Sequence, residues 1–209
     1  MKCEKIPGKV AIIDYKAGNA PSVLHAANKV GANAILAKTA NDFEDATHII
    51  LPGVGSARAT MQSLAEMGFM AELENAVLHK KVPFLGICIG MQVLFEHSEE
   101  SDTNCLGWLK GNVVKFDSKI ERVPQMGWNK VVFTKKTPVG AIDDYYYYVN
   151  SYYVKPADIT DTWGITEYGV TFTAAACRGN IHAMQFHVEK SGETGLKLLR
   201  GFLSLKAGE

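Results

Sequence analysis

The sequence lacks an excess of charge of either sign, long apolar runs and paired cysteines. It contains 22 Lys and Arg against 22 Asp and Glu, so its charge balance favours neither a nucleic acid nor an acidic membrane surface as partner. Its apolar runs, such as residues 48–51, are far too short for a helix that crosses a bilayer. The four cysteines share no C-x-x-C spacing, which argues against a zinc or disulfide framework and for reduced thiols.

The start of the chain also lacks the apolar segment that a signal peptide needs, because residues 1–7 are mostly charged or polar. We therefore expect a cytoplasmic protein. A length of 209 residues suits one large α/β domain, and we find no repeat, linker or low-complexity segment. The sequence predicts a single domain over residues 1–209.

Apolar runs alternate with amphipathic segments in the first half of the chain. We expect strands at 9–14, 34–37, 47–51 and 83–87, and helices at 22–30, 57–67, 71–79 and 89–96. Strands and helices that alternate through short loops imply right-handed crossovers and a parallel sheet.

Beyond residue 107 the pattern changes to short β-rich runs separated by turn residues. This pattern predicts antiparallel strands at 113–116, 130–134, 145–149, 164–168 and 171–177, with a hairpin turn at Tyr168-Gly169. We expect a last strand at 180–187 and a closing amphipathic helix at 192–205.

Cys88 lies where the fourth predicted strand meets a helix, in the stretch Gly86-Ile-Cys88-Ile-Gly90. Glycines on both sides permit a sharp strand-to-helix turn, which is the geometry of a nucleophile elbow with sulfur in place of a hydroxyl. The positive end of the helix would favour thiolate over thiol. A free cysteine is more often a small buried hydrophobe, but this context favours a nucleophile.

The loop Pro52-Gly-Val-Gly55 follows the third predicted strand. Its glycines permit backbone N–H groups to point at a ligand oxygen, as in an oxyanion hole, although a plain turn explains them equally well. A dinucleotide-binding fingerprint is excluded, since Arg58 stands where a third Gly or Ala belongs.

His187 and Glu189 lie at the end of the last predicted strand. In an extended chain residues two apart point the same way, so the carboxylate could orient the imidazole as in a catalytic triad. The Pro-Cys-x-x-Cys partner of the zinc deaminases, which also use His-x-Glu, is absent. We interpret the remaining histidines as structural or solvated: His25, His48, His79, His97 and His182.

A run of tyrosines, residues 145–153, is typical of a packed sheet face. Its polar end, Asn150-Ser151-Tyr152, could contact a small polar substrate through hydroxyl and backbone groups.

Taken together, Gly86-Ile-Cys88-Ile-Gly90-Met-Gln92 and His187-x-Glu189 resemble the signatures of the class I, triad-type glutamine amidotransferases. Further motifs resemble one branch of them, the glutaminase subunits of imidazole glycerol phosphate synthase. These motifs are Ile13-Asp-Tyr-x-x-Gly-Asn19, Pro52-Gly-Val-Gly55, Met91-Gln-Val-Leu-Phe-Glu-x-Ser-Glu-Glu100, Pro124-Gln-Met-Gly-Trp-Asn129 and Ser151-Tyr-Tyr153. The likeness runs from about residue 9 to residue 204.

The resemblance implies a flavodoxin-like three-layer α/β/α sandwich with a mostly parallel sheet and antiparallel strands in the C-terminal half. It implies an enzyme that hydrolyses L-glutamine through a cysteine thioester, without metal or organic cofactor. The ammonia would pass to a (β/α)₈-barrel cyclase subunit in a heterodimer that serves histidine biosynthesis.

The resemblance also implies roles for particular residues. Cys88 would be the nucleophile, His187 the base and Glu189 the orienting carboxylate. The oxyanion hole would be formed by the backbone of Gly53, Val54 and Ile89. Glutamine would be bound by Gly55, Gln92, Ser151 and Tyr152. The partner interface and ammonia exit would include Trp128, Tyr147 and Lys190.

Four positions depart from the usual pattern of that branch: Lys16 and Ala17, Asn150 in place of a common His, and Val188 in place of a frequent Pro. Three alternatives stay open on the sequence. They are a related glutaminase subunit serving another acceptor, such as a surface sugar, a stand-alone cysteine hydrolase, and a binding module that has kept the fold.

Overall fold

The computed structural model describes residues 5–15 and 19–206, and within them the strands join in one 13-stranded sheet. The helices are α1 (Ala20–Lys29), α2 (Ala57–Glu66), α3 (Met70–Glu74), α4 (Ile89–Gln92) and α5 (Gly192–Leu203). The strands are β1 (Lys9–Ile13), β2 (Asn33–Ala37), β3 (Ala46–Leu51), β4 (Phe84–Ile87), β5 (His97–Ser98), β6 (Thr103–Asn104), β7 (Gly111–Lys115), β8 (Gln125–Phe133), β9 (Asp144–Asn150), β10 (Tyr152–Pro156), β11 (Thr162–Glu167), β12 (Thr171–Arg178) and β13 (Ile181–Met184). One of the four cysteines, Cys3, lies outside the described residues. So do Lys16 and Ala17, two of the positions that depart from the pattern of the resembling branch.

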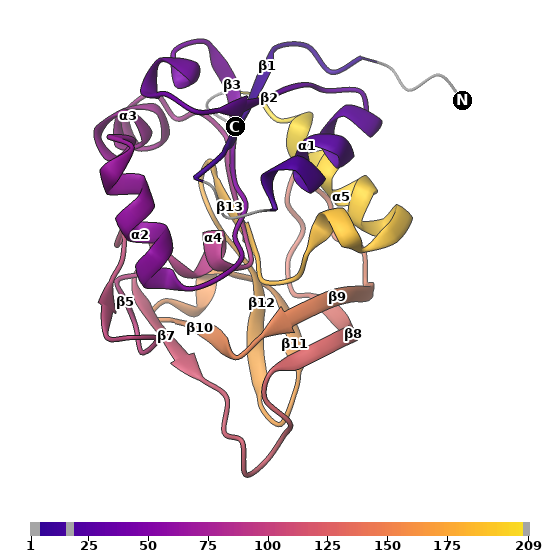
Figure 1. Ribbon diagram of the computed structural model, residues 1–209. Coiled ribbons are helices and arrows are strands. Elements are labelled where there is room, and N and C mark those ends of the chain that lie inside the picture. The colour runs from indigo at the N-terminus through magenta and orange to yellow at the C-terminus, as the bar shows by residue number, and fades with distance from the viewer. Residues whose placement is uncertain (1–4, 16–18, 207–209) are drawn as a thin grey trace.

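The parallel half of the sheet has the order β2-β1-β3-β4-β13. Helices α1 and α5 cover one of its faces and α2, α3 and α4 the other (Figure 1). Strands β4 and β13 are buried along their whole length, as apolar strands covered on both faces should be. The predicted three-layer flavodoxin-like fold is confirmed.

The second half of the chain adds antiparallel strands to this sheet. Strand β12 pairs with β13 and also with β10. Strand β11 pairs with β12 and β8, and so joins the β8–β9 ribbon, which projects beside the sheet (Figure 1). Strands β11 and β12 form the predicted hairpin, and Gly169 in its turn has a φ of 65°.

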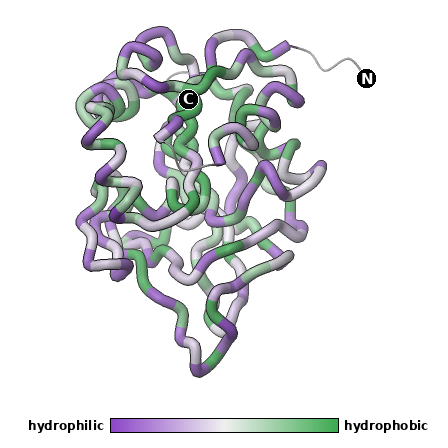
Figure 2. The backbone as a smooth tube through the Cα atoms, viewed as in Figure 1, coloured by the Kyte–Doolittle hydropathy of each residue, from purple (hydrophilic) through white to green (hydrophobic). Residues whose placement is uncertain are grey.

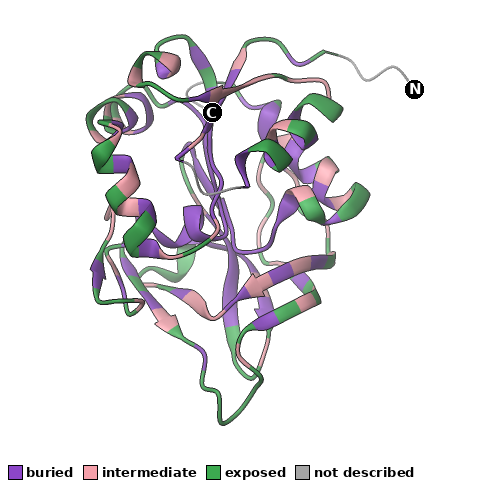
Figure 3. Ribbon diagram, in the orientation of Figure 1, coloured by how far each residue is buried: buried purple, intermediate pink, exposed green. Residues whose placement is uncertain are grey.

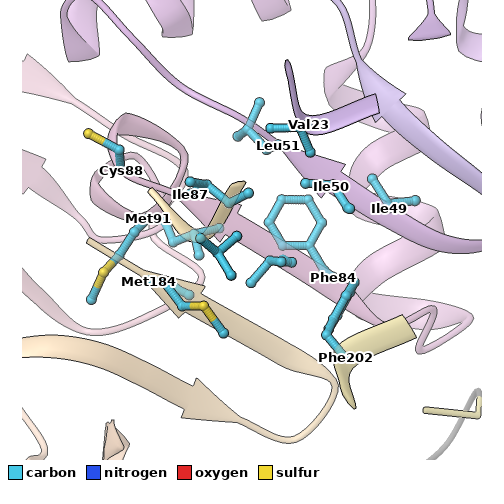
Figure 4. Packing of buried hydrophobic residues seen from close by; sticks show 14 of the residues in the cluster. Val23, Ile49, Ile50, Leu51, Phe84, Ile87, Cys88, Met91, Met184 and Phe202 are labelled. Atoms are coloured by element: carbon cyan, nitrogen blue, oxygen red, sulfur yellow. The ribbon is translucent and has the colours of Figure 1, made fainter. Parts of the chain in front are cut away.

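The core lies between the central strands and the two helical layers, where apolar residues concentrate (Figure 2) and burial is most complete (Figure 3). Phe84 of β4, Ile50 of β3 and Phe202 of α5 all belong to this buried cluster (Figure 4). The Phe84 ring packs edge-on against Trp108. Cys88 lies at the margin of this cluster with its sulfur turned away from the Phe84 ring (Figure 4). The apolar core therefore stops at the carboxyl ends of the parallel strands. Ligand sites of such sheets lie at this edge.

Two elements end three or four residues earlier than predicted. The helix expected at 89–96 ends at Gln92, because the chain turns back to the sheet. There the Glu96 N–H donates to the Gly111 carbonyl, and the Gly111 N–H donates to Glu96 Oε2. The strand expected at 180–187 ends at Met184. The helix expected at 71–79 becomes π-helical over Asn75–His79.

Within the described residues no helix is both long and apolar enough to cross a membrane.

Candidate active site

Cys88 occupies the turn between β4 and α4 with φ 55° and ψ −110°, a conformation that non-glycine residues rarely adopt. Its backbone N–H donates to the Met184 carbonyl at 2.8 Å, which ties the turn to the end of β13. Such strain persists only where the surrounding structure enforces it, and it is typical of functional sites.

The flanking glycines act differently from what we expected. Neither Gly86 nor Gly90 has a positive φ, and Cys88 itself makes the turn. A Cβ on Gly86 would lie 2.4 Å from the Gly90 carbonyl oxygen, and one on Gly90 would lie 2.0 Å from the Leu51 carbonyl oxygen. The glycines therefore give the space in which the elbow packs onto β3 and β4, not conformational freedom.

His187 Nδ1 lies 2.8 Å from Glu189 Oε1, and both side chains are buried. The expected extended chain between them is wrong, because residues Val188–Lys190 form a 3₁₀ turn. The carboxylate reaches back to the imidazole across this turn. Val188 is its first residue, a position that also suits the Pro common in the resembling branch.

Asn19 Nδ2 donates to the same Glu189 Oε1 at 2.9 Å, from the far end of the chain. Ser191 fixes the backbone of the other partner, since its Oγ donates to the His187 carbonyl at 2.7 Å. The imidazole and carboxylate are thus held from several sides.

Charge around His187 is arranged to keep the ring protonated. Burial alone would lower the pKa of His187, but hydrogen bonds to Cys88 and Glu189 outweigh burial and raise it well above its usual range. Burial would likewise raise the pKa of Glu189, yet the interaction with His187 lowers it. The ring therefore bridges the sulfur and a carboxylate.

A pocket of about 300 Å³ opens over the Cys88 sulfur, at the small end of the range for ligand sites. The predicted site residues that line it are Val54, Gly55, Cys88, Ile89, Gln92, Ser151, Tyr152, His187 and Lys190. Glu189 lies behind His187, and Gly53 lies outside the pocket, beside Tyr15 and Asn19. Trp128 and Tyr147 lie on the β8–β9 ribbon outside the pocket, with their rings in edge contact at 6.1 Å.

The backbone N–H of Val54 is directed at the hydroxyl of Tyr15, which also lies 3.4 Å from Thr60 Oγ1. Burial raises the pKa of Tyr15 to about 12, so this hydroxyl stays neutral. The Val54 N–H consequently faces the buried tyrosine.

Sequence reasoning gave no role to three residues that the structure brings to the site. Glu100 lines the pocket, and its Oε2 is held by the Ala57 N–H at 2.8 Å. Asn19 bonds the Glu189 carboxylate, and Gln185 lies 3.6 Å from the Cys88 sulfur. Asn19 and Glu100 belong to motifs quoted above, which was the available signal, whereas Gln185 lies in the strand predicted at 180–187.

Within the described residues no group of three or more His, Cys, Asp or Glu side chains could hold a metal ion. A cysteine at a strained strand end, facing an imidazole that a carboxylate orients, defines a site for acyl transfer through sulfur.

Comparison with known proteins agrees with this class. The family described as "Glutamine amidotransferase class-I" matches residues 11–205. The "Imidazole glycerol phosphate synthase subunit HisH 1" of Campylobacter jejuni (strain RM1221) is 42% identical over 201 residues, covering 94% of this chain and 100% of the relative. The corresponding HisH subunit of Herpetosiphon aurantiacus is 43% identical over 202 residues, covering 94% of each chain.

Among solved structures, PurLQS from Thermotoga maritima superposes with a TM-score of 0.75 at 18% identity, covering 93% of this chain and 97% of that one. At this identity the likeness shows the fold alone. The chain belongs to the class I glutamine amidotransferases and, within them, to the family of the HisH subunits.

Proposed function

We propose that this chain is the glutaminase subunit of an imidazole glycerol phosphate synthase, which hydrolyses L-glutamine and delivers the ammonia to a second subunit. The observation that carries the proposal is the strained Cys88 beside the His187–Glu189 pair at the floor of a small pocket. The family and the names of the relatives support the same reaction.

The chemistry follows from the groups around the sulfur. The Cys88 sulfur attacks the carboxamide carbon of glutamine, and the carbonyl electrons move onto oxygen. Backbone N–H groups of Ile89 and of residues 53–54 are the proposed oxyanion donors. His187 gives its proton to the departing nitrogen, so ammonia leaves and a thioester remains. Water then attacks the thioester with His187 as base, and glutamate is released.

Substrate recognition rests on polar groups at the rim of the pocket. Glu100 is the carboxylate that faces the pocket, and we assign it to the α-ammonium group of glutamine. Gln92 has a buried Oε1 without a partner inside the described chain, which suits the carboxamide NH₂ of the substrate. Gly55, Ser151 and Tyr152 would hold the remaining backbone and carboxylate contacts. A demand for an α-ammonium group favours glutamine over the ester or peptide of a stand-alone hydrolase.

The partner would dock on the β8–β9 ribbon. Met126 and Trp128 on β8, and Tyr145 on β9, are 67%, 55% and 56% exposed, which is unusual for large apolar side chains. Tyr147 packs beside Trp128, and its carbonyl accepts the His187 N–H, so this surface connects directly to the triad. Lys190 lies at the pocket mouth.

We infer a (β/α)₈-barrel cyclase of the HisF type as the partner, in a cytoplasmic heterodimer. A direct contact at this surface would let ammonia pass without protonation in bulk water.

The proposal is tested with 6-diazo-5-oxo-L-norleucine, a diazoketone analogue of glutamine that alkylates a nucleophile at the carboxamide position. We expect one adduct, on the peptide that contains Cys88, and protection by excess glutamine. The half-buried thiols Cys105 and Cys177 serve as internal controls. Adducts that spread to Cys105 and Cys177, or labelling that glutamine does not slow, would overturn the assignment.

A further inference from the structure

Gln185 is a fully buried polar side chain that the reaction above does not use. It follows β13, and its backbone N–H donates to the Ala174 carbonyl at 2.8 Å, which fixes its place on the sheet. Its side-chain Nε2 lies 3.6 Å from the Cys88 sulfur. It approaches the nucleophile from inside the protein, since it is not among the residues that line the pocket.

The orientation of the Gln185 amide is determined by its neighbours. The Tyr152 carbonyl can only accept, so the Gln92 group 3.1 Å away must be its NH₂. The same NH₂ lies 3.0 Å from Gln185, and the Gln185 atom facing it must therefore be the oxygen. This leaves the NH₂ of Gln185 facing the sulfur.

We propose that Gln185 is a further catalytic residue for glutamine hydrolysis, whose side-chain amide donates a hydrogen bond to the Cys88 sulfur and holds it as an aligned thiolate. A thiolate accepts hydrogen bonds far better than a thiol, so an N–H donor stabilises the reactive form. The proposal rests on the proposed glutaminase function.

The hydrogen bonds of Gln185 also connect the Cys88 sulfur to the wall of the pocket. Gln92 donates to both Tyr152 and Gln185, so the pocket wall and the nucleophile share one hydrogen-bonded chain of amides. Substrate that binds against Gln92 therefore lies at one end of the chain that ends on the sulfur. Hydrogen bonds in such chains polarise one another.

The test is the pH profile of Cys88 alkylation by iodoacetamide, followed by mass spectrometry of the Cys88 peptide. Gln185→Met keeps the length of the side chain and removes the donor. We expect alkylation at neutral pH to slow about 10- to 100-fold and the profile to shift toward alkaline pH, since hydrogen bonds to charged groups are worth this much. In glutamine hydrolysis we expect kcat to fall by a similar factor and KM to change little.

Gln125→Met is the matched control, because Gln125 is also buried and its side-chain amide forms no hydrogen bond within the described chain. If Gln185→Met does not fold, Gln185→Asn replaces it in the test, because the shorter side chain moves the N–H donor away from the sulfur. An unchanged alkylation profile in a folded variant would overturn the proposal. Alkylation needs no substrate, so it distinguishes failure of this inference from failure of the glutaminase assignment.

Discussion

Cys88 is buried, and its φ of 55° is one that residues other than glycine rarely adopt. A non-glycine residue in such a conformation costs about 1–3 kcal/mol, and the elbow retains it because Gly86 and Gly90 let the surrounding backbone pack closely. The turn places Cys88 at the edge of the apolar cluster with its sulfur pointing away from the cluster (Figure 4), and Cys88 lines the pocket.

This strain predicts an inverted order of stability. Cys88→Gly should be about 1 kcal/mol more stable than Cys88→Ala, because glycine relieves the strain and loses only part of the gain to its flexible unfolded state. Urea unfolding of the two inactive variants measures the difference. If the Ala variant were the more stable one, the elbow would not be strained.

In the proposed mechanism Glu189 orients the base His187 and does not touch substrate. In Glu189→Gln the pKa of His187 should fall, because the neutral amide no longer stabilises the protonated ring. We expect kcat to fall by up to about 10⁴-fold, as in the equivalent substitution of a serine triad, which is still less than the complete loss in Cys88→Ala. An NMR titration of the His187 ring and steady-state kinetics measure both effects. An unshifted titration would remove Glu189 from its orienting role.

The loop between β3 and α2 is where the free chain and an active enzyme should differ. The Val54 N–H is directed at Tyr15 in this structure, while an oxyanion would require backbone donors at the sulfur. Peptide units next to glycine turn at little steric cost, so docking of a partner could reorient this one.

Tyr15→Phe removes the hydroxyl that faces the Val54 N–H. We expect the glutaminase activity of the isolated variant to rise roughly tenfold, part of the about 10²- to 10³-fold that one oxyanion donor contributes. Thr60→Val, which removes the hydroxyl 3.4 Å from Tyr15 but leaves the tyrosine in place, is the control. Steady-state glutamine hydrolysis without partner decides the matter, and an unchanged or lower rate would mean that Tyr15 does not restrain the loop.

The sequence predicted those elements whose structure is determined by neighbouring residues. The buried strands, the elbow at Cys88 and the pairing of His187 with Glu189 followed from apolar runs and short motifs. The early end of α4 at Gln92 and the 3₁₀ turn over Val188–Lys190 did not, because tertiary contacts override helix and strand preference there.

Contacts between segments far apart in the sequence could not be predicted either, because they too depend on tertiary structure. Asn19 and Glu189 are 170 residues apart, and Gln185 and Cys88 are 97 apart. Asn19, Cys88 and Glu189 were visible in motifs, but no spacing rule connects distant residues of this kind. Only the order of strands in the sheet brings these side chains to one site.

Two buried histidines link the stability of the whole molecule to pH. Burial lowers the pKa of His48 to about 4, and burial likewise lowers the pKa of His182 to about 4. Because each folded-state pKa lies below the unfolded value of about 6.5, the unfolded chain binds more protons as the pH falls, and stability is lost below about pH 6.5.

We expect the free energy of unfolding to decrease between pH 7 and pH 5 by on the order of 2 kcal/mol for each histidine. Urea unfolding at both pH values measures this decrease. His182 packs against Trp163 and Phe202, and His182→Phe should remove its own share of the decrease, on the order of 2 kcal/mol. A decrease equally large in the variant would assign the acid sensitivity to other groups.

In the proposed function, ammonia is produced in this chain and used in a partner. The nucleophile, the base and the pocket then belong to this chain, and the acceptor chemistry belongs to a partner docked on the β8–β9 ribbon. Removing the sulfur should therefore disable only the first half of the reaction.

The decisive measurement is product formation by the cyclase partner in complex with the Cys88→Ala chain, supplied with glutamine or with ammonium salts. We predict that glutamine-dependent synthesis disappears while ammonium-dependent synthesis stays within about twofold of the wild-type complex, because the variant still docks and only the thioester is lost. Substantial glutamine-dependent product from the variant complex, or equal loss with both nitrogen sources, would contradict the assignment.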